Sequence, residues 1–405
     1  MKLNRLKIFL CLCLVLCMSV GLCGCFFISR EMGDLDLGLG SKPVTEPTQN
    51  PDYHDKVDEI VSILEEYYVD GYSDEGLGDY LAEAAVNSAG DRWSYYISAD
   101  EFESYMEENN NAYVGIGVTI QLINEDDEGY TVVSVTSNSP AYKAGIEIGD
   151  MIVAVEGESV IALGMDETKN RVKGEEGTEV TLTIKRGEEQ FDLRITRGLV
   201  EVDVVVWEML PDSIGYIKIN NFDANACRDS LRAIEALTGE GAKALVFDVR
   251  FNPGGKKTEL VQLLDYLLPE GPLFRAVDYE GREEVDYSDE DFLDIPMAVL
   301  INEDSYSAAE FFAAALQEYE AAVIVGTQTT GKANYQQTFR LSDGSAIAIS
   351  TGHYQTPNGV TLEGLGVTPD VPVEVDYETY LALYYGEVEK QNDAQLQAAI
   401  TAVKE

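Results

Sequence analysis

The chain has 405 residues, of which 45% are hydrophobic and 9% aromatic, enough apolar material for about two or three packed units, so a wholly disordered chain is excluded. Its formal net charge is −45, from 28 basic and 73 acidic residues spread along the sequence. This charge indicates a strongly soluble surface and repels phosphate backbones, so nucleic acid is excluded as a partner.

The first 28 residues have the pattern of an export signal. Three basic residues precede an almost uncharged run over residues 8–28. Within it, Leu22-Cys23-Gly24-Cys25 is similar to a bacterial lipobox, which implies a signal peptide over 1–24 and lipidation of Cys25. An uncleaved anchor reaching residue 28 and a soluble secreted form stay open as alternatives. All three predict a body outside the cytoplasm, and the first two attach it to the bacterial cell membrane.

The cysteines and histidines exclude further kinds of site. Five of the six cysteines lie in residues 1–25, so Cys227 is alone in the body and no intrachain disulfide framework can form there. Cys227 falls in an expected helix and is interpreted as a packing residue. His54 and His353 are the only histidines, and no Cys or His cluster has ligand spacing. We therefore expect no metal and no other cofactor.

The first ordered elements are expected to be helices. Residues 25–52, rich toward their end in Gly, Pro, Ser and Thr, are predicted to form a flexible tether. Apolar residues then recur at helical spacing over 54–68, and 80–87 and 99–108 have similar patterns. Residues 53–107 are therefore predicted to form a small N-terminal helical unit.

Short alternating strands follow over residues 108–200. Strands are expected at 117–122, 131–135, 151–155 and 180–185, and helices at 140–144 and 166–172. This order resembles a PDZ domain, as do Tyr113-Val114-Gly115-Ile116-Gly117-Val118, Ser139-Pro140-Ala141 and Gly149-Asp150-Met151-Ile152. The resemblance implies that a C-terminal peptide tail binds by backbone N–H groups and β-augmentation at Val114, Gly115, Ile116, Gly117 and Val118. A turn that only opens a strand is the alternative.

Strands and helices alternate after residue 201, which predicts an α/β core over 201–405. Strands are expected at 215–220, 242–249, 297–301 and 322–325, and helices at 224–237, 258–268 and 307–319. A hairpin over 336–341 and 346–351 follows. The predicted fold class is therefore α/β and multi-domain, with a helical unit, a PDZ domain and a core of βα units that ends in a hairpin.

Ser307 stands where a buried strand is expected to meet a helix. A serine becomes a nucleophile only when a base takes its proton and donors hold the developing oxyanion. A helix N-terminus favours negative charge and offers free backbone N–H groups. Taken alone, however, a serine at this junction is more simply a helix N-cap.

Several motifs around Ser307 together resemble the carboxyl-terminal processing peptidases. They are Asn302, Ser305, Ser307 and Glu310 after a buried strand, Thr330-Gly331-Lys332 with Gln336, Asp248-Val249-Arg250, Asn252-Pro253-Gly254-Gly255, and the run 362–370. The match extends from about residue 53 to the end, in the family's order and spacing.

The resemblance implies a serine endopeptidase that cleaves near the C-termini of proteins with exposed apolar tails. It assigns the nucleophile to Ser307, the general base to Lys332, and the orientation of that lysine to Gln336. The oxyanion donors fall on the N–H of Ala308 and of a glycine in the 252–255 turn, Gly254 being preferred. Because lysine is a base only when neutral, Lys332 must be desolvated.

Three alternatives stay open: a Ser/His pair that uses His353, Ser305 as the nucleophile, and a catalytically silent scaffold that binds C-terminal peptides. A trypsin-like protease is excluded because neither histidine has the required context. The sequence predicts neither the physiological substrate nor the oligomeric state, and a homo-oligomer stays open.

Overall fold

The computed structural model describes residues 52–123 and 128–404. The chain divides between residues 75 and 76 into two units. In the first unit the described structure is helix α2 (Tyr53–Tyr67), at the start of which the Asp52 side chain accepts the N–H of His54. No helix among the described residues is both long enough and apolar enough to span a bilayer.

The second unit begins with α3 (Leu77–Asn87) and α4 (Phe102–Asn110), which we expected to share a unit with α2. An unexpected short strand, β1 (Tyr95–Ile97), lies between them in the chain. It pairs with a strand from the far end of the sequence, and this pairing brings residues 91–97 to the candidate site described below.

A small antiparallel sheet in the order β3-β4-β5-β7-β8, with β6 paired to β5, forms the centre of the region expected to be a PDZ domain. The elements are β3 (Val118–Gln121), β4 (Tyr130–Val135), α5 (Pro140–Ala144), β5 (Met151–Val155), β6 (Glu158–Ser159), α6 (Val160–Leu163), α7 (Met165–Val172), β7 (Glu179–Arg186) and β8 (Glu189–Thr196). This sheet has its own buried core, which includes Val132, Val180 and Leu182. A two-stranded ribbon, β2 (Ala112–Gly115) with β9 (Gly198–Glu201), connects it to the rest of the chain.

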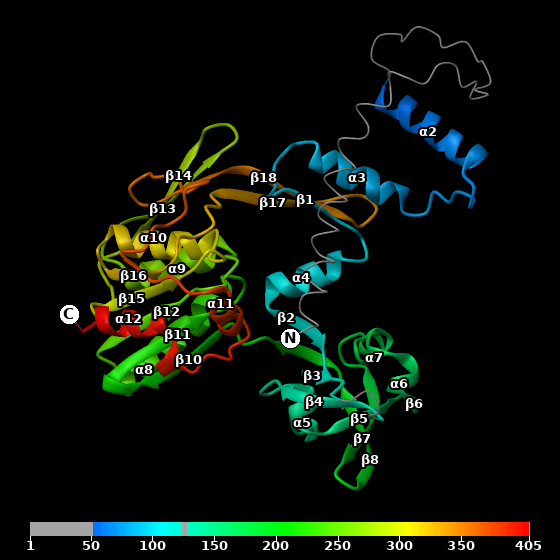
Figure 1. The fold of residues 1–405 in the computed structure, drawn as a ribbon, viewed down its shortest axis with the longest axis horizontal. Coiled ribbons are helices and arrows are strands. Elements are labelled where there is room, and N and C mark those ends of the chain that lie inside the picture. Colours follow the sequence, from blue (N-terminus) through cyan, green and yellow to red (C-terminus); the bar gives the residue numbers. More distant parts are fainter. Residues whose placement is uncertain (1–51, 124–127, 405) are drawn as a thin grey trace, which may run out of the picture. The chain divides into compact units, whose positions relative to one another are not determined.

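The large sheet has the order β10-β11-β12-β15-β16-β19, antiparallel between β10 and β11 and parallel beyond (Figure 1). Its strands are β10 (Val205–Leu210), β11 (Ile214–Ile219), β12 (Ala244–Asp248), β15 (Met297–Ile301), β16 (Ala322–Gly326) and β19 (Val371–Pro372). Every residue of β12 and β15 is buried, as expected of parallel strands covered on both faces.

Helices cover both faces of this sheet. Alternate strand residues such as Ile217, Phe247 and Val299 belong to one core with α8 (Ala226–Gly239), α9 (Lys257–Leu267) and α10 (Ala308–Glu318). The intervening residues, such as Val246 and Leu300, belong to a second core with α12 (Ala394–Ala402). Because successive side chains of a strand point to opposite faces, the sheet lies between two layers of helices, which gives three layers in all. The expected α/β, multi-domain fold class is therefore confirmed.

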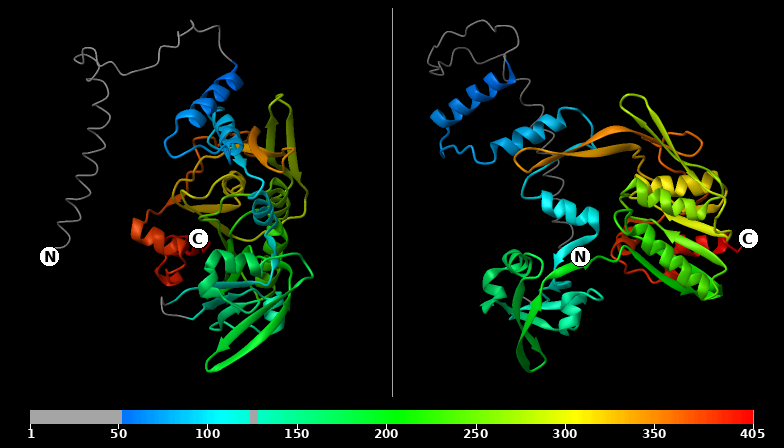
Figure 2. Two further views of the ribbon diagram at one scale, coloured as in Figure 1. Left: turned by 90° about the vertical axis from the view of Figure 1, so that its right-hand side faces the viewer. Right: turned by 180° about the vertical axis from the view of Figure 1, so that it is seen from behind.

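A second sheet supplies the platform for the candidate site. The expected hairpin is present as β17 (Asn334–Arg340) and β18 (Ala346–Gln355), drawn in orange in Figure 2. Strand β18 also pairs with β1 and with β13 (Gly271–Asp278), which forms an unpredicted hairpin with β14 (Glu283–Ser288). Helix α11 (Tyr377–Tyr384) and a short 3-10 turn (Lys390–Asn392) precede α12.

Candidate active site

Residues from distant parts of the second unit line one cleft of about 770 Å³. The site residues expected from sequence that line it are Gly254, Ser307, Lys332 and Gln336. The structure adds Arg92, Trp93 and Tyr306 to them. The nucleophile and the base of the expected dyad therefore face a common space large enough for a peptide.

Ser307 has a strained backbone. It lies between β15 and α10 with φ 56° and ψ −124°, a conformation that L-residues rarely adopt. Gly254 (φ 91°) lies against it, since a Cβ on Gly254 would lie 2.8 Å from Ser307 Cβ and 2.9 Å from the backbone nitrogen of Ala308. Only glycine fits this approach, and such strain is typical of functional turns.

The carboxylate of Glu310 joins the segment of Ser307 to the segment of Lys332. Glu310 is fully buried and accepts the N–H of Ser307 at 2.9 Å, of Gly331 at 2.7 Å and of Lys332 at 2.8 Å. The Thr329 hydroxyl also donates to it. Burial raises the pKa of Glu310, and these hydrogen bonds oppose the rise. One buried carboxyl group thus fixes the backbones on both sides of the dyad.

The amine of Lys332 lies beside aromatic rings. Its Nζ is 4.7 Å from the ring centroid of Trp93 and 5.6 Å from that of Tyr306. Burial lowers the pKa of Lys332, although the nearby carboxylates of Asp91, Glu310 and Glu363 oppose this change. A lowered pKa favours the neutral amine that a general base requires. Among the hydrogen bonds of the described residues, Lys332 donates through its backbone N–H and not through Nζ.

Gln336 contacts the segment around Trp93. Its Nε2 donates to the backbone carbonyl oxygen of Trp93 at 2.5 Å, and in this arrangement the amide makes no hydrogen bond to Lys332 among the described residues. Trp93 was not expected at the site, because it is far earlier in the sequence and precedes the PDZ region. The one feature of the sequence that could have drawn attention to Trp93 is the rarity of tryptophan, since the chain contains 2.

The two expected oxyanion donors differ in whether their N–H groups already donate a hydrogen bond. The N–H of Ala308 has no hydrogen-bond partner within the residues that the structure describes. The N–H of Gly254 donates to Oδ1 of Asn252 at 2.8 Å, and the N–H of Gly255 in the same turn has no partner among the described groups. The turn therefore offers Gly255 as an unengaged donor, whereas Gly254 must exchange a hydrogen bond before it can hold an oxyanion.

Ser305 and His353 occupy structural positions. The Ser305 hydroxyl is fully buried, donates to the Val249 carbonyl oxygen at 2.7 Å and accepts the N–H of Asn302 at 3.0 Å. His353 is exposed on β18, with Nδ1 2.7 Å from Oδ1 of Asn334. Neither residue lines the cleft. The geometry therefore favours Ser307 and Lys332 over both enzymatic alternatives.

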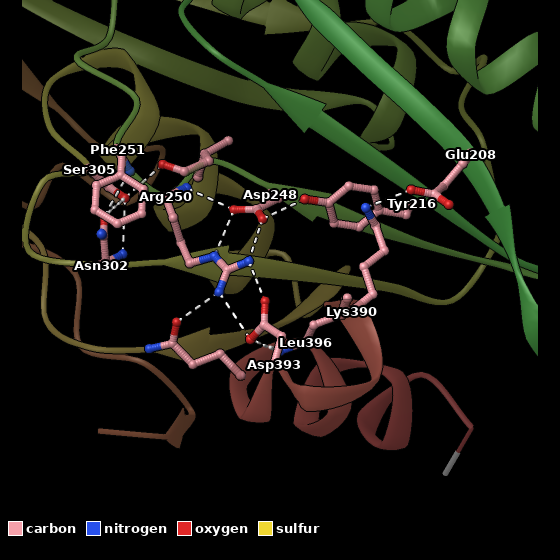
Figure 3. A network of polar contacts seen from close by, with 12 residues as sticks. Glu208, Tyr216, Asp248, Arg250, Phe251, Asn302, Ser305, Lys390, Asp393 and Leu396 are labelled. Carbon is pink, nitrogen blue, oxygen red and sulfur yellow. Dashed lines mark hydrogen bonds and ion pairs between the residues drawn. The ribbon is translucent and has the colours of Figure 1, made fainter. Parts of the chain in front are cut away.

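A buried ionic network anchors the turn that carries Gly254 (Figure 3). The Arg250 guanidinium, 5% exposed, donates to Asp248 at 2.6 and 2.9 Å, to Asp393 at 2.8 and 3.2 Å, and to Gln395 at 3.0 Å. The Tyr216 hydroxyl donates to Asp248 at 2.7 Å. Burial would raise the pKa of Asp248, but the Arg250 charge and these hydrogen bonds lower it overall. The network links β11, β12 and the start of α12.

In the region expected to be a PDZ domain, the predicted tail-binding residues form one continuous stretch. Val114 and Gly115 end β2, Ile116 and Gly117 form a loop, and Val118 starts β3, an edge strand of its sheet. The N–H groups of Ile116 and Gly117 have no partner within the described residues. A Cβ on Gly117 (φ 83°) would lie 2.3 Å from Ser139 Cβ. Free donors beside an open edge are what β-augmentation requires.

Of the two cysteines discussed in the sequence analysis, only Cys227 lies among the described residues. Cys25, the predicted lipidation site, lies outside the described residues. Cys227 is buried on α8, and burial raises the pKa of its thiol to about 11, which keeps it protonated and unreactive. The packing interpretation of Cys227 therefore agrees with its surroundings.

Two family models match the chain. Residues 213–373 match Peptidase family S41, and residues 131–186 match PDZ domain. The segment 213–373 is therefore similar to peptidase family S41. The resemblance predicted from its motifs is confirmed, and the S41 match contains Gly254, Ser307, Lys332 and Gln336. The PDZ match begins after the loop at 114–118, so that loop is assigned by its geometry.

Curated relatives agree with this family. A protein of Staphylococcus epidermidis (strain ATCC 12228 / FDA PCI 1200), named "Probable CtpA-like serine protease", is 32% identical over 322 residues, which are 78% of this chain and 65% of the relative. A protein of Staphylococcus haemolyticus (strain JCSC1435) with the same name is 32% identical over 312 residues, 75% of this chain and 62% of the relative. This chain therefore spans less than two thirds of each.

Among solved structures, the photosystem II D1 C-terminal processing protease matches 72% of this chain and 80% of its own. Its sequence identity is 26% and its TM-score 0.44.

Proposed function

We propose that this chain is a member of peptidase family S41, a serine endopeptidase that uses Ser307 as nucleophile and Lys332 as general base. The observation that carries the proposal is that both residues line one cleft, with their backbones joined by the buried carboxylate of Glu310. The lowered pKa of Lys332 supports its role, because it raises the fraction of neutral amine at neutral pH.

The proposed reaction is acyl transfer through the serine. Neutral Lys332 takes the proton of Ser307 Oγ as this oxygen attacks the scissile carbonyl carbon. The negative oxygen of the tetrahedral intermediate accepts hydrogen bonds from the N–H of Ala308 and of a glycine in the 252–255 turn. The protonated lysine then gives its proton to the leaving amine as the C–N bond breaks. Neutral Lys332 then takes a proton from water as the water oxygen attacks the acyl carbon, and it returns this proton to Ser307 Oγ as the ester C–O bond breaks.

The first step requires a movement of the Lys332 side chain. Nζ now lies beside the Trp93 ring and must come within about 3 Å of Ser307 Oγ to take its proton. The flexible four-carbon stem allows this movement while Glu310 keeps the lysine backbone in place. We infer that Gln336 contributes by holding the 91–94 segment against the cleft.

We further propose that the PDZ domain selects substrates by their C-terminal tails. The N–H groups of Ile116 and Gly117, which have no partner within the described residues, would bind the terminal carboxylate, and the edge strand β3 would pair with the last residues of an apolar tail. Amidation of the substrate C-terminus removes the carboxylate charge and should slow cleavage. Equal cleavage of amidated and free-tailed substrates would contradict this role.

The proposed location is outside the cytoplasm, attached to the bacterial membrane by a lipid on Cys25 or by an uncleaved N-terminal segment. Cys25→Ser should block signal processing and leave a longer precursor, measured as intact mass. An unchanged mass with unchanged membrane attachment would favour the uncleaved anchor.

The decisive test of the activity is a set of matched substitutions. Ser307→Ala and Lys332→Ala should each abolish cleavage of an unfolded protein with an apolar tail, with fragments mapped by mass spectrometry. Ser305→Ala and His353→Ala should retain cleavage if folded, as judged by thermal melting. Activity in either dyad variant, or its loss in His353→Ala alone, would overturn the assignment. A silent scaffold would leave the substrate uncleaved by the unchanged chain.

A further inference from the structure

The indole of Trp93 covers the amine of Lys332. Nζ lies 4.7 Å from the Trp93 ring centroid, and the Trp93 and Tyr306 rings are stacked with centroids 6.2 Å apart and planes inclined by 24°. A cation within about 6 Å of a ring centroid is attracted by the ring. The same ring also takes the place of water that would otherwise hydrate the amine.

Trp93 is held at this place by its neighbours. Asp91 Oδ1 accepts the Trp93 N–H at 3.1 Å, and the Ser94 hydroxyl donates to Asp91 Oδ2 at 2.5 Å. The Ser350 N–H donates to Ser94 Oγ at 3.1 Å, and Gln336 Nε2 donates to the Trp93 carbonyl oxygen. The turn at 91–94 is therefore fixed to the hairpin that follows the catalytic lysine, and the ring position is part of the folded structure.

The indole is not the side chain that packing alone would select. Its Nε1 is buried and has no hydrogen-bond partner within residues 52–123 and 128–404. An unpaired buried donor costs about 1–3 kcal/mol. Leucine or phenylalanine would fill much of the same space without that cost. Leucine, however, has no electron-rich face for a cation, and phenylalanine presents a smaller one than tryptophan.

Four charged groups also act on the amine of Lys332. Asp91, Glu310 and Glu363 favour its protonated form, and Arg92 opposes protonation. Arg92 itself lies over the Trp93 ring, with Cζ 4.2 Å from the centroid. Burial is the largest influence and favours the neutral form. Trp93, which contributes to the burial of the amine, therefore strongly affects the equilibrium between neutral and protonated Lys332.

We propose that Trp93 is a positioning residue that sets the protonation state of Lys332. Its bulk excludes water and favours the neutral amine, while its π face attracts the ammonium and limits that effect. The inference deepens the proposed function and rests on the role of Lys332 as the base.

Three substitutions separate the two effects. Trp93→Ala removes both, and because burial dominates, water entry should raise the lysine pKa. Each unit of rise removes about ten-fold of the neutral amine at pH 7, so activity should fall by about that factor and recover near pH 10. Trp93→Leu keeps apolar cover without the ring face, so the midpoint of its pH profile should move to lower pH. Trp93→Phe keeps both in part and should lie nearest the unchanged chain.

The experiment should titrate Lys332 directly as well as through activity. The full chain carrying Ser307→Ala is treated with limiting acetic anhydride at a series of pH values, and acetylation of Lys332 is quantified by mass spectrometry for each Trp93 variant. Trp207→Leu, at an exposed tryptophan on β10, is the matched control and should leave the titration unchanged.

Opposite displacements of the titration midpoint in Trp93→Ala and Trp93→Leu support the proposal. Displacement in the same direction, or no displacement, overturns it. If Trp93→Ala does not fold, the comparison of Trp93→Leu with Trp93→Phe decides, because only Leu should lower the midpoint clearly. If Lys332→Ala retains protease activity, the proposed base is wrong, yet the acetylation titration still reports whether Trp93 controls the amine.

Discussion

The proposed tail-binding loop and the proposed catalytic cleft are built in opposite ways. The loop consists of consecutive residues, 114–118, whose backbone N–H groups are the proposed donors to a peptide tail. The cleft takes single side chains or turns from four distant segments, near residues 93, 254, 307 and 332. The loop depends mainly on local backbone geometry, whereas the cleft depends on the packing of the whole core.

This difference predicts where the molecule is vulnerable. A change far from the cleft can misplace a catalytic group, because displacement of a catalytic group by about 1 Å can cost about 100-fold in rate. The loop should respond only to changes that fill or strain the loop itself. The following predictions test this contrast, from the largest expected effect to the smallest.

Among changes outside the Ser307/Lys332 pair, Gly254→Ala should have the largest effect on catalysis. The new Cβ would lie 2.8 Å from Ser307 Cβ and from the Tyr306 carbonyl oxygen, so the serine and the oxyanion turn must separate. Loss of oxyanion geometry costs about 100- to 1000-fold in kcat, to be measured with a tail-bearing substrate. Gly241→Ala is the matched control, because Gly241 has a similar φ of 96° but open space around its Cβ position. Similar losses in both variants would contradict this account.

Arg250→Met should test whether the cleft depends on packing distant from it. It leaves Asp248 and Asp393 buried without their cation, which costs about 3–5 kcal/mol of unfolding free energy, measured by urea denaturation. The pKa of Asp248 is lowered in the fold, so its contribution to stability is present above the ordinary carboxyl pKa and is lost as pH falls through the folded pKa. This acid-sensitive contribution should disappear in Arg250→Met.

The control for that prediction is the double variant Arg250→Met with Asp248→Asn. Removing the uncompensated charge should restore part of the stability lost in the single variant. A double variant less stable than Arg250→Met would show that the carboxylate is not the source of the loss.

The pH profile of proteolysis should rise through the lowered pKa of Lys332. Below that pKa, activity should fall about ten-fold for each pH unit, because only the neutral amine is a base. Tail binding to the PDZ loop should be nearly constant over the same range, since it uses backbone donors. A maximum near pH 5 would indicate carboxylate catalysis instead.

Gly117→Ala should weaken tail binding by about ten-fold, because the strained φ and the contact with Ser139 both distort the loop. The affinity for a fluorescent tail peptide, measured by anisotropy, reports the effect. Gly145→Ala is the control, since Gly145 has φ 85° in the same region but no atom within 4 Å of its Cβ position. If Gly145→Ala weakens binding of the tail peptide equally, the 114–118 loop is not the binding site for the tail.

Lys332→Met should be inactive yet slightly more stable. The lysine pKa is lowered in the fold, so the protonated form destabilises it, and stability increases with pH between the folded pKa and the ordinary value. Removing the buried amine should raise the melting temperature at pH 7 by roughly 2 °C. A lower melting temperature would show that the attraction to the rings and nearby carboxylates outweighs desolvation.

Much of the fold could be predicted because each element carries its own pattern. Strands β5 and β15 were predicted to the residue, β5 as a short alternating strand between turns and β15 as a buried apolar run. The β13–β14 hairpin and β1 were missed, since β1 has only three residues and is defined by pairing with a strand some 250 positions away. Long-range pairing leaves little local signal.

The site shows the same limit. Ser307, Lys332 and Gly254 were predicted because each stands in a recognisable motif, and the structure brings all three to one cleft. Trp93 was missed because its place beside Lys332 arises only once β1 has paired with β18. The sequence also could not show that the Gly254 N–H is engaged by Asn252, since this depends on a side-chain rotamer.

The ionic network that includes Asp393 affects when, during translation, the turn of Gly254 can become fixed. Asp393 follows every residue of the cleft in the chain, yet its carboxylate holds Arg250, which begins the turn of Gly254. At about 5–20 residues per second, the ribosome needs on the order of several seconds to pass from Lys332 to Asp393. During that interval the nascent chain has its serine and its lysine but not the carboxylate that fixes the oxyanion turn. We therefore expect completion of the turn, and with it the proposed proteolysis, to follow translation of this late segment.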